Sequence, residues 1–144
     1  MTADSKDTPS ALQPLPVRLA PGDDVRARLE AIVREQGIGA AFILSGIGSL
    51  SRARLRFAGD REARDLAGAF EIVSLMGTLS RDGAHLHAAL SDAEGRLVAG
   101  HVCSGCIVRT TAEVLIAILP GWTFRRVHDD ATGYPELTPL PQPR

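Results

Sequence analysis

The sequence predicts an α+β domain with a largely antiparallel β-sheet and one main N-terminal helix. A helical pattern near residues 23–37 precedes a long series of strand patterns, and this order is typical of the class. The chain has 144 residues, 44% of them hydrophobic, and shows neither a linker nor an internal repeat. We therefore expect a single domain at residues 15–137, between a disordered tail at 1–14 and a proline-rich tail at 138–144.

The expected helix follows Pro21 and Gly22. Asp23 or Asp24 can cap it, because an aspartate side chain accepts hydrogen bonds from the free backbone amides of the first turn. Gly37 supplies the left-handed residue with which many helices end. Apolar residues recur between these limits at helical spacing, so one face is expected to pack on the sheet. That apolar stripe consists of Val25, Leu29, Ile32 and Val33.

Strand patterns account for most of the chain after Gly39. Residues 51–57 alternate polar and apolar side chains with a period of two, as a half-buried strand does. A turn containing two glycines is expected at 46–49, and a polar loop at 59–68. The expected strands are 40–44, 51–57, 70–79, 85–90, 97–102, 107–119 (with a break) and 123–127.

Composition narrows the classes of function and location. The 16 basic residues nearly balance the 17 acidic ones, which gives no support to nucleic-acid binding across the whole surface. The first residues are polar and lack the apolar run of a signal peptide. The longest apolar stretches, such as residues 114–119, are too short to cross a bilayer. We expect a cytoplasmic protein without membrane contact.

Three histidines form the strongest functional pattern in the chain. His85 and His87 are two residues apart in one expected strand, so their side chains lie on the same face. The next segment has the composition of a hairpin turn, with Asp92 at its start and Gly95 at the left-handed position of a three-residue loop. Counting outward from that loop places His101 opposite His87.

The turn decides whether the three rings converge. A two-residue loop would shift the register by one residue and move His101 to the opposite face. With the three-residue loop, His85, His87 and His101 form a candidate site for a divalent metal, with zinc expected. Three histidines with an open position are typical of catalytic zinc, and the same register places Cys103 opposite His85 as a fourth group. A solvated strand face is the alternative explanation.

Two further motifs have ordinary alternatives. Cys103 and Cys106 match the C-x-x-C pattern, but they lie between two expected strands rather than at the start of a helix. Two small hydrophobic residues are therefore the favoured explanation. The glycines at 46 and 48 resemble part of a phosphate-binding loop, but the full glycine pattern and the following helix are missing.

Charged residues in the expected strands are weaker candidates. Arg52, Arg54 and Arg56 share one face and could meet phosphates or an acidic ligand, although a solvated face explains them equally well and is favoured. Glu71 and Glu113 lie among apolar strand residues, so each is a candidate for an acid–base role or for orienting a ligand. Pairing with arginine, or exposure at an edge, is the more frequent explanation for both.

The motifs that carry a family resemblance run through residues 16–137. They are Gly22 to Val25, Ala41 to Leu50, Phe70 to Ile72 with Gly77, the His85 and His87 pair, Gly95, Gly100 with His101, Phe124 to Val127, Asp129, Thr132 with Gly133, and Leu137. In this order they resemble the PPC domain (plants and prokaryotes conserved, also written PCC), in its stand-alone bacterial form.

This resemblance implies a homotrimer with sites near the subunit contacts. Plant members join the domain to an AT-hook, an Arg-Gly-Arg-Pro type segment that enters the DNA minor groove, and no Arg-Gly-Arg occurs here. A DNA-binding role taken from them would rest on a part that we expect this protein to lack. The fold is also similar to that of acetolactate decarboxylase, a zinc enzyme with a comparable histidine set, which supports a metal site at His85, His87 and His101.

Three functions remain open at this point. The family label implies a regulatory or assembly module associated with DNA. The histidines are compatible with a zinc-dependent lyase or hydrolase acting on a small oxygenated acid, with an arginine holding its carboxylate. Candidates for supporting roles are Glu71, Glu113 and Arg126. A structural or small-ligand-binding trimer, in which the histidines are incidental or only stabilising, is the third.

Overall fold

The computed structural model describes residues 11–143, and this range contains one helix and eight strands. All strand pairings are antiparallel, which confirms the predicted α+β class. The elements are β1 (Gln13–Leu19), α1 (Val25–Gln36), β2 (Ala41–Arg56), β3 (Arg64–Ser80), β4 (Gly83–Ser91), β5 (Leu97–Val102), β6 (Ile107–Ile118), β7 (Trp122–Asp129) and β8 (Tyr134–Pro141).

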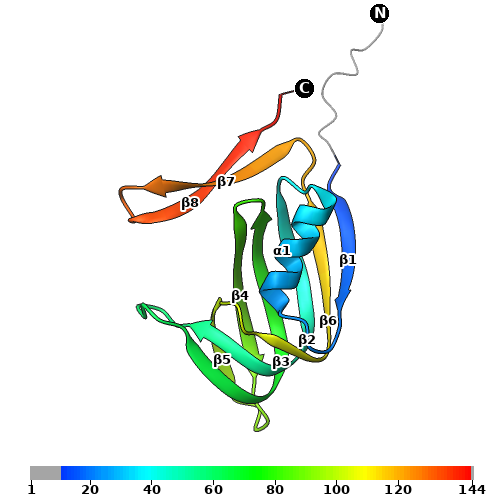
Figure 1. Cartoon of the computed structure of the whole chain (residues 1–144), viewed down its shortest axis with the longest axis vertical. Helices are drawn as coiled ribbons and strands as arrows, with labels where there is room; N and C mark the ends of the chain where they lie inside the picture. Colours follow the sequence, from blue (N-terminus) through cyan, green and yellow to red (C-terminus); the bar gives the residue numbers. More distant parts are fainter. Residues whose placement is uncertain (1–10, 144) are drawn as a thin grey trace, which may run out of the picture.

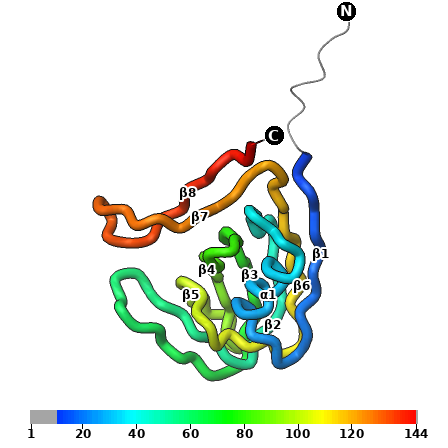
Figure 2. The backbone as a smooth tube through the Cα atoms, turned by 45° about the horizontal axis from the view of Figure 1, so that its top comes forward, coloured from blue at the N-terminus to red at the C-terminus, as the bar shows by residue number. Residues whose placement is uncertain are grey.

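Six strands form one curled sheet in the order β1-β6-β2-β3-β4-β5. The far edge of this sheet returns to β2, because β5 also pairs with the end of β2 through Leu55 with Val102 and Arg56 with His101. The curl is visible at the lower left of Figure 1. Strands β7 and β8 form a separate two-stranded sheet, and Figure 2 shows this arm passing across one end of the larger sheet, beyond β3 and β4.

Helix α1 forms as the sequence predicts. The side chain of Asp24 caps it by accepting a hydrogen bond from the backbone N of Ala27 at 3.1 Å, and Gly37 ends it with a φ of +64°. The predicted apolar stripe is buried and joins the hydrophobic core between the helix and the sheet. This packing fixes the helix over β3, β4 and β6, so its polar side chains lie next to the start of β4.

The predicted turn at 46–49 is absent, because β2 runs through it as a single strand of 16 residues. The two glycines allow close approach of the neighbouring strands instead. A Cβ on Gly46 would lie 2.8 Å from Cβ of Leu75 on β3, and one on Gly48 would lie 2.4 Å from the carbonyl oxygen of Thr111 on β6. The close spacing of the strands therefore explains why glycine occupies these two positions. The segment resembles a phosphate-binding loop in sequence but does not form one.

Strand limits differ from the expected ones in two more places. The expected polar loop at 59–68 is shorter, since β3 already begins at Arg64, and β6 runs from Ile107 to Ile118 without the expected break. The β2–β3 ladder contains a register shift, a β-bulge or irregularity, between Leu50 and Arg52. The long strands continue past the apolar core and carry polar side chains toward the histidines.

Both expected tails contribute strands. Residues 1–10 of the expected N-terminal tail lie outside the described residues, but β1 begins at Gln13 and pairs with β6. Residues through Pro141 of the expected C-terminal tail pair with β7. The prolines of these strands occupy alternate positions, so their nitrogens face the unpaired edge and no ladder hydrogen bond is lost. They are Pro14 and Pro16 in β1, and Pro135, Pro139 and Pro141 in β8.

Among residues 11–143 there is no helix with the length and apolar character that crossing a membrane requires. The only helix in this range, α1, has 12 residues and carries its apolar side chains on one face.

Candidate metal centre

The hairpin between β4 and β5 has the predicted three-residue loop. The backbone N of Asp92 donates to the carbonyl oxygen of Arg96 at 2.9 Å, and Gly95 has a φ of +78°. Pairing then continues along both strands until His87 lies opposite His101. The predicted register is therefore confirmed, and the alternative with His101 on the opposite face is excluded.

The side chain of Asp92 holds this loop in place. Its carboxylate accepts hydrogen bonds from the backbone N of Glu94 and of Arg96, each at 2.9 Å, and from Nε of Arg96 at 3.0 Å. The backbone donor of Arg96, followed by its side chain and the amide of Glu94, lowers the pKa of Asp92 below its usual value. An ionised aspartate at the start of the turn thus fixes the register on which the histidines depend.

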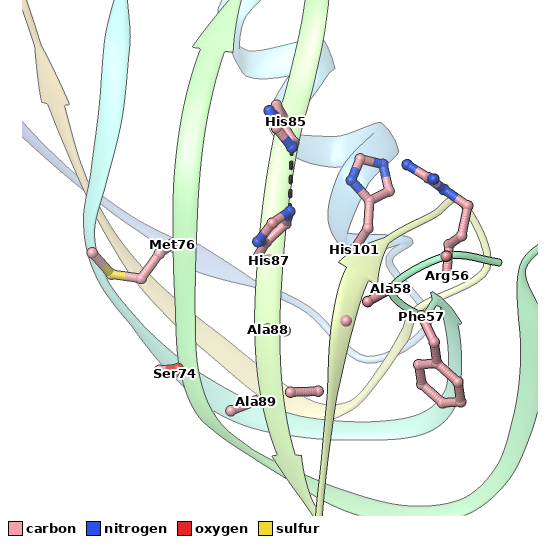
Figure 3. Close-up of a pocket in the computed structure, with 13 residues that line it drawn as sticks. Arg56, Phe57, Ala58, Ser74, Met76, His85, His87, Ala88, Ala89 and His101 are labelled. Carbon is pink, nitrogen blue, oxygen red and sulfur yellow. Dashed lines mark hydrogen bonds between the residues drawn. The ribbon is translucent and has the colours of Figure 1, made fainter. Parts of the chain in front are cut away.

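The three imidazoles face one another across the β4–β5 ladder, as Figure 3 shows. One nitrogen from each of His85, His87 and His101 lies within 4.8 Å of the other two. Nε2 of His85 and Nε2 of His87 are only 3.2 Å apart. Among the described residues, this is the one group of at least three histidine, cysteine or acidic side chains with such a geometry.

These distances fit a small divalent cation. With zinc–nitrogen bonds of 2.0–2.1 Å and a tetrahedral angle, two ligand nitrogens lie about 3.3 Å apart, close to the spacing of His85 and His87. In addition, Nδ1 of His101 is buried and has no hydrogen-bond partner, a costly state for a polar atom in a folded protein. A bound cation at the cluster would give a partner to this nitrogen and would replace the contact between Nε2 of His85 and Nε2 of His87.

The electrostatic surroundings keep two of the rings neutral. Burial, and then the charge of Arg56, lowers the pKa of His101 to about 4. Burial, and then the charge of Arg126, lowers the pKa of His85 below its ordinary value. A metal ligand must be the unprotonated imidazole, so both rings are ready to bind at neutral pH without first losing a proton.

A cavity of about 540 Å³ opens beside the cluster. All three histidines line it, and so do Phe57 from the end of β2 and Met76 from β3. The arrangement joins three nitrogen ligands to a space large enough for a small molecule. His85, His87 and His101 would hold a metal beside this cavity, where it would supply Lewis-acid chemistry to a small molecule.

The predicted fourth group, Cys103, does not join the cluster. Strand β5 ends at Val102, and the backbone N of Cys103 donates to the carbonyl oxygen of Arg54 on β2 at 3.0 Å, so the register that would bring it opposite His85 stops before it. Cys106 is buried, and this burial raises the pKa of its thiol to about 11. The favoured explanation, two small structural residues, agrees with this placement.

The other candidates separate into two groups. Glu71 and Glu113 are exposed on β3 and β6 and line neither cavity beside the histidines. Arg126 lies at the site, where it lines a second cavity together with His85. Of the three arginines on β2, Arg52 pairs with Asp65 at 2.8 Å on the surface, as expected for a solvated face.

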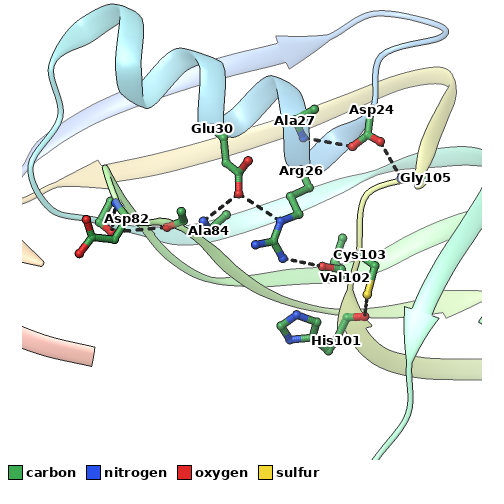
Figure 4. A network of polar contacts seen from close by, with 12 residues as sticks. Asp24, Arg26, Ala27, Glu30, Asp82, Ala84, His101, Val102, Cys103 and Gly105 are labelled. Carbon is green, nitrogen blue, oxygen red and sulfur yellow. Dashed lines mark hydrogen bonds and ion pairs between the residues drawn. The ribbon is translucent and has the colours of Figure 1, made fainter. Parts of the chain in front are cut away.

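One arginine of the site, Arg26, was not a candidate in the sequence analysis, whereas Arg56 was a candidate for which a solvated face was favoured. Arg56 lines both cavities, because its strand position pairs with that of His101, so the favoured solvated face does not hold for this residue. Arg26 approaches from the first turn of α1 and donates to the carbonyl oxygen of Val102 at 3.2 Å, as Figure 4 shows. No local signal in the sequence marks Arg26, since it reaches the site through contacts between distant segments.

Comparison with known proteins identifies the family. A family model described as the Plants and Prokaryotes Conserved (PCC) domain matches residues 6–120. This chain belongs to the PCC domain family. The match covers the helix, the curled sheet and all three histidines of this PCC domain.

Two curated relatives share the PCC domain but are much longer. Bifunctional protein GlmU of Synechococcus sp. (strain JA-2-3B'a(2-13)) is 44% identical over 129 residues, covering 90% of this chain and 20% of the relative. AT-hook motif nuclear-localized protein 15 of Arabidopsis thaliana is 32% identical over 130 residues, covering 85% of this chain and 42% of that protein. The chain thus spans about a fifth of the first relative and less than half of the second.

Two solved structures share the whole fold. A hypothetical protein from Salmonella superposes with a TM-score of 0.90 at 39% identity, with 95% of this chain and 99% of that chain covered. A metal-containing protein from Archaeoglobus fulgidus gives a TM-score of 0.78 at 27% identity, with 91% and 96% covered. The PCC fold described above is therefore shared over nearly its full length.

Proposed function

We propose that this PCC-domain protein holds a zinc ion at His85, His87 and His101 and acts as a zinc-dependent lyase or hydrolase on a small oxygenated acid. The observation that carries the proposal is the convergence of three imidazoles at the edge of a cavity, with the Nε2 atoms of His85 and His87 only 3.2 Å apart. The Archaeoglobus relative, described as metal-containing, supports it.

The protein's own residues prepare the site for this chemistry. His85 and His87 project from one strand and His101 from its neighbour, so the ligands are held by a paired backbone rather than by a loop. Neutral rings and a buried free nitrogen favour metal binding. When bound, zinc would polarise a carbonyl group or lower the pKa of a water molecule. The adjoining cavity would orient the acid beside it.

Elemental analysis tests the first half of this proposal. Protein purified without an affinity tag or added metal should contain about one zinc per chain, and the three single alanine variants should contain none. Zinc in none of these proteins, or equal zinc in all of them, would contradict the site. Turnover of small hydroxy or oxo acids should vanish on chelation and return with added zinc, whereas turnover indifferent to chelators would refute the enzyme.

A DNA-associated regulatory role is the second candidate. It is favoured by the relative from Arabidopsis thaliana, whose name refers to an AT-hook and to the nucleus. A salt series with duplex DNA tests it, because phosphate contacts must weaken steeply as salt rises. No binding at low salt would remove this function, because phosphate contacts are strongest under that condition.

We also propose that the chain assembles as a homotrimer. Large apolar side chains are about half-exposed on the strands β2 and β3, including Leu44 (49%), Ile47 (52%), Val73 (52%) and Met76 (50%). A second copy of the chain would cover such a surface. Light scattering should give three times the chain mass of 15.3 kDa. If the histidines are incidental to the assembly, His87→Ala leaves the trimer and its melting temperature unchanged.

A further inference from the structure

A second cavity, of about 440 Å³, also borders the histidines. It shares His85 and His101 with the first cavity but has a different character, because three arginines line it. They come from three separate elements: Arg26 from α1, Arg56 from β2 and Arg126 from β7. All three are half-buried, so their charges face a space that is partly shielded from solvent.

Two of the three guanidinium groups, those of Arg26 and Arg126, are held in position by neighbouring residues. Nε of Arg26 pairs with Oε1 of Glu30 at 3.1 Å, while its Nη1 donates to the carbonyl oxygen of Val102, the residue that follows His101 (Figure 4). Nη2 of Arg126 donates to Oγ1 of Thr78 at 2.7 Å. Arg56 lies next to His101 in Figure 3. Groups held in this way lose less entropy when they bind a ligand than free surface arginines do.

The acidic residues of the cavity do not neutralise it. Asp82 accepts hydrogen bonds from Nε of Arg125 at 2.7 Å and from the backbone N of Arg126 at 2.9 Å. Oε1 of Glu136 accepts a hydrogen bond from the hydroxyl of Thr132 at 2.9 Å. Glu30 balances the charge of Arg26, and Arg125 balances that of Asp82. Arg56 and Arg126 then stand against Glu136 alone, so the cavity carries an excess of positive charge.

We infer that Arg26, Arg56 and Arg126 form a binding site for the oxyanion group, carboxylate or phosphate, of a small acid. A guanidinium group offers paired N–H donors that match two oxygens of such a group. An anion held there lies next to His85 and His101, so a second oxygen of the same molecule can reach the metal centre. Only this second contact rests on the proposed function, and the anion site itself requires no metal.

Calorimetric titration of the full-length, metal-free protein at pH 7.5 and low salt tests this inference. The probes are succinate, inorganic phosphate and the uncharged diamide succinamide. Succinate or phosphate should bind and weaken as salt rises, whereas succinamide should not bind. Tighter binding of succinate would assign the site to carboxylates, and tighter binding of phosphate to phosphoryl groups.

Three variants locate the binding. Arg56→Gln and Arg126→Gln should each weaken the preferred anion at least about tenfold, because each removes a charge-assisted hydrogen bond. Arg109→Gln, at an exposed position on β6, removes the same charge elsewhere and should change affinity less than about twofold. If Arg126→Gln, which also loses the hydrogen bond to Thr78, has a lower melting temperature than the wild type, Arg56→Gln alone tests the anion site.

Absence of anion binding, or equal binding by wild type and both cavity variants, would overturn the inference. Zinc titration of the same samples separates this outcome from failure of the proposed function. Arginine-dependent anion binding without zinc binding would retain the anion site and refute the metal centre. Zinc binding without anion binding would retain the metal centre and refute the anion site.

Discussion

The histidines and the cysteines lie within 22 residues of each other, yet the fold treats them in opposite ways. His85, His87 and His101 face one another beside a cavity, and a buried nitrogen among them is left without a partner. Cys106 is sealed in the core, where its sulfur accepts a hydrogen bond from the backbone N of Arg54 at 3.2 Å. Residues that can bind a metal therefore form a candidate site only where the strand register brings their side chains together and leaves them exposed to a cavity.

Removing a ligand from each group should give the largest difference. His87→Ala takes away one of three nitrogens, so its zinc affinity should fall by more than the roughly 10–100-fold that losing an outer-shell partner costs. Cys103→Ser should leave zinc affinity within about twofold, because that sulfur lies outside the cluster. Competition with a chromogenic chelator measures both. Equal losses in the two variants would mean that cysteine takes part after all.

Loosening the β4–β5 turn should affect the histidines next most strongly. Asp92→Ala removes three hydrogen bonds at the loop, and the free energy of unfolding should fall by about 1–2 kcal/mol. Zinc affinity should fall with it, since the two strands of the site are joined there. Glu94→Ala is the matched control, because it loses only an exposed ion pair with Arg96, worth about 0–1 kcal/mol. Urea unfolding compares the two, and equal stability would contradict the role of Asp92.

Loosening the cysteine segment should leave the metal centre intact. Asp24 both caps α1 and accepts a hydrogen bond from the backbone N of Gly105 at 2.6 Å, between the two cysteines. Asp24→Ala should therefore lower the free energy of unfolding by about 1 kcal/mol without changing zinc affinity. Asp24→Asn keeps a capping oxygen and should recover most of the loss. A fall in zinc affinity for Asp24→Ala would show that the two regions are coupled.

Acid should produce the smallest of these effects in the metal-free protein. His101 has a pKa of about 4 in the folded chain and near 6.5 when unfolded, so the unfolded state takes up its proton first. Stability from this group is present above pH 6.5 and is lost as pH falls toward 4. Solvent screening of the partly exposed ring limits the change to about 1 kcal/mol. Thermal melts should show this loss, and His101→Asn should melt with a flatter dependence on pH over the same range.

The parts of the fold that local chemistry determines could be predicted from the sequence. Asp24, Gly37 and the apolar stripe define α1, and Asp92 with Gly95 defines the hairpin that aligns His87 with His101. In each case a few neighbouring residues satisfy their own backbone hydrogen bonds, so the pattern is complete within a short segment.

The parts that depend on distant partners could not be predicted. The glycines of β2 have the composition of a turn, and only the close approach of Leu75 and Thr111 explains them. Strand β8 contains prolines at alternate positions, and the sequence alone predicts a tail for this proline-rich segment. Arg26 has no local signal and Arg56 was expected on a solvated face, and only the packing of α1 and the curl of the sheet bring both to the histidines. Long-range contacts thus bring the positively charged side chains to the site.

The closure of the sheet onto β2 links the metal ligands to their charged neighbours. Because Arg56 and His101 occupy paired positions on β2 and β5, the strand ladder holds the two residues next to each other. The separation between a cation on the histidines and an anion on the arginine is then limited by the paired backbone and by the reach of one arginine side chain. Such a limited range would favour small ligands, whose two ends can contact both groups, over long analogues.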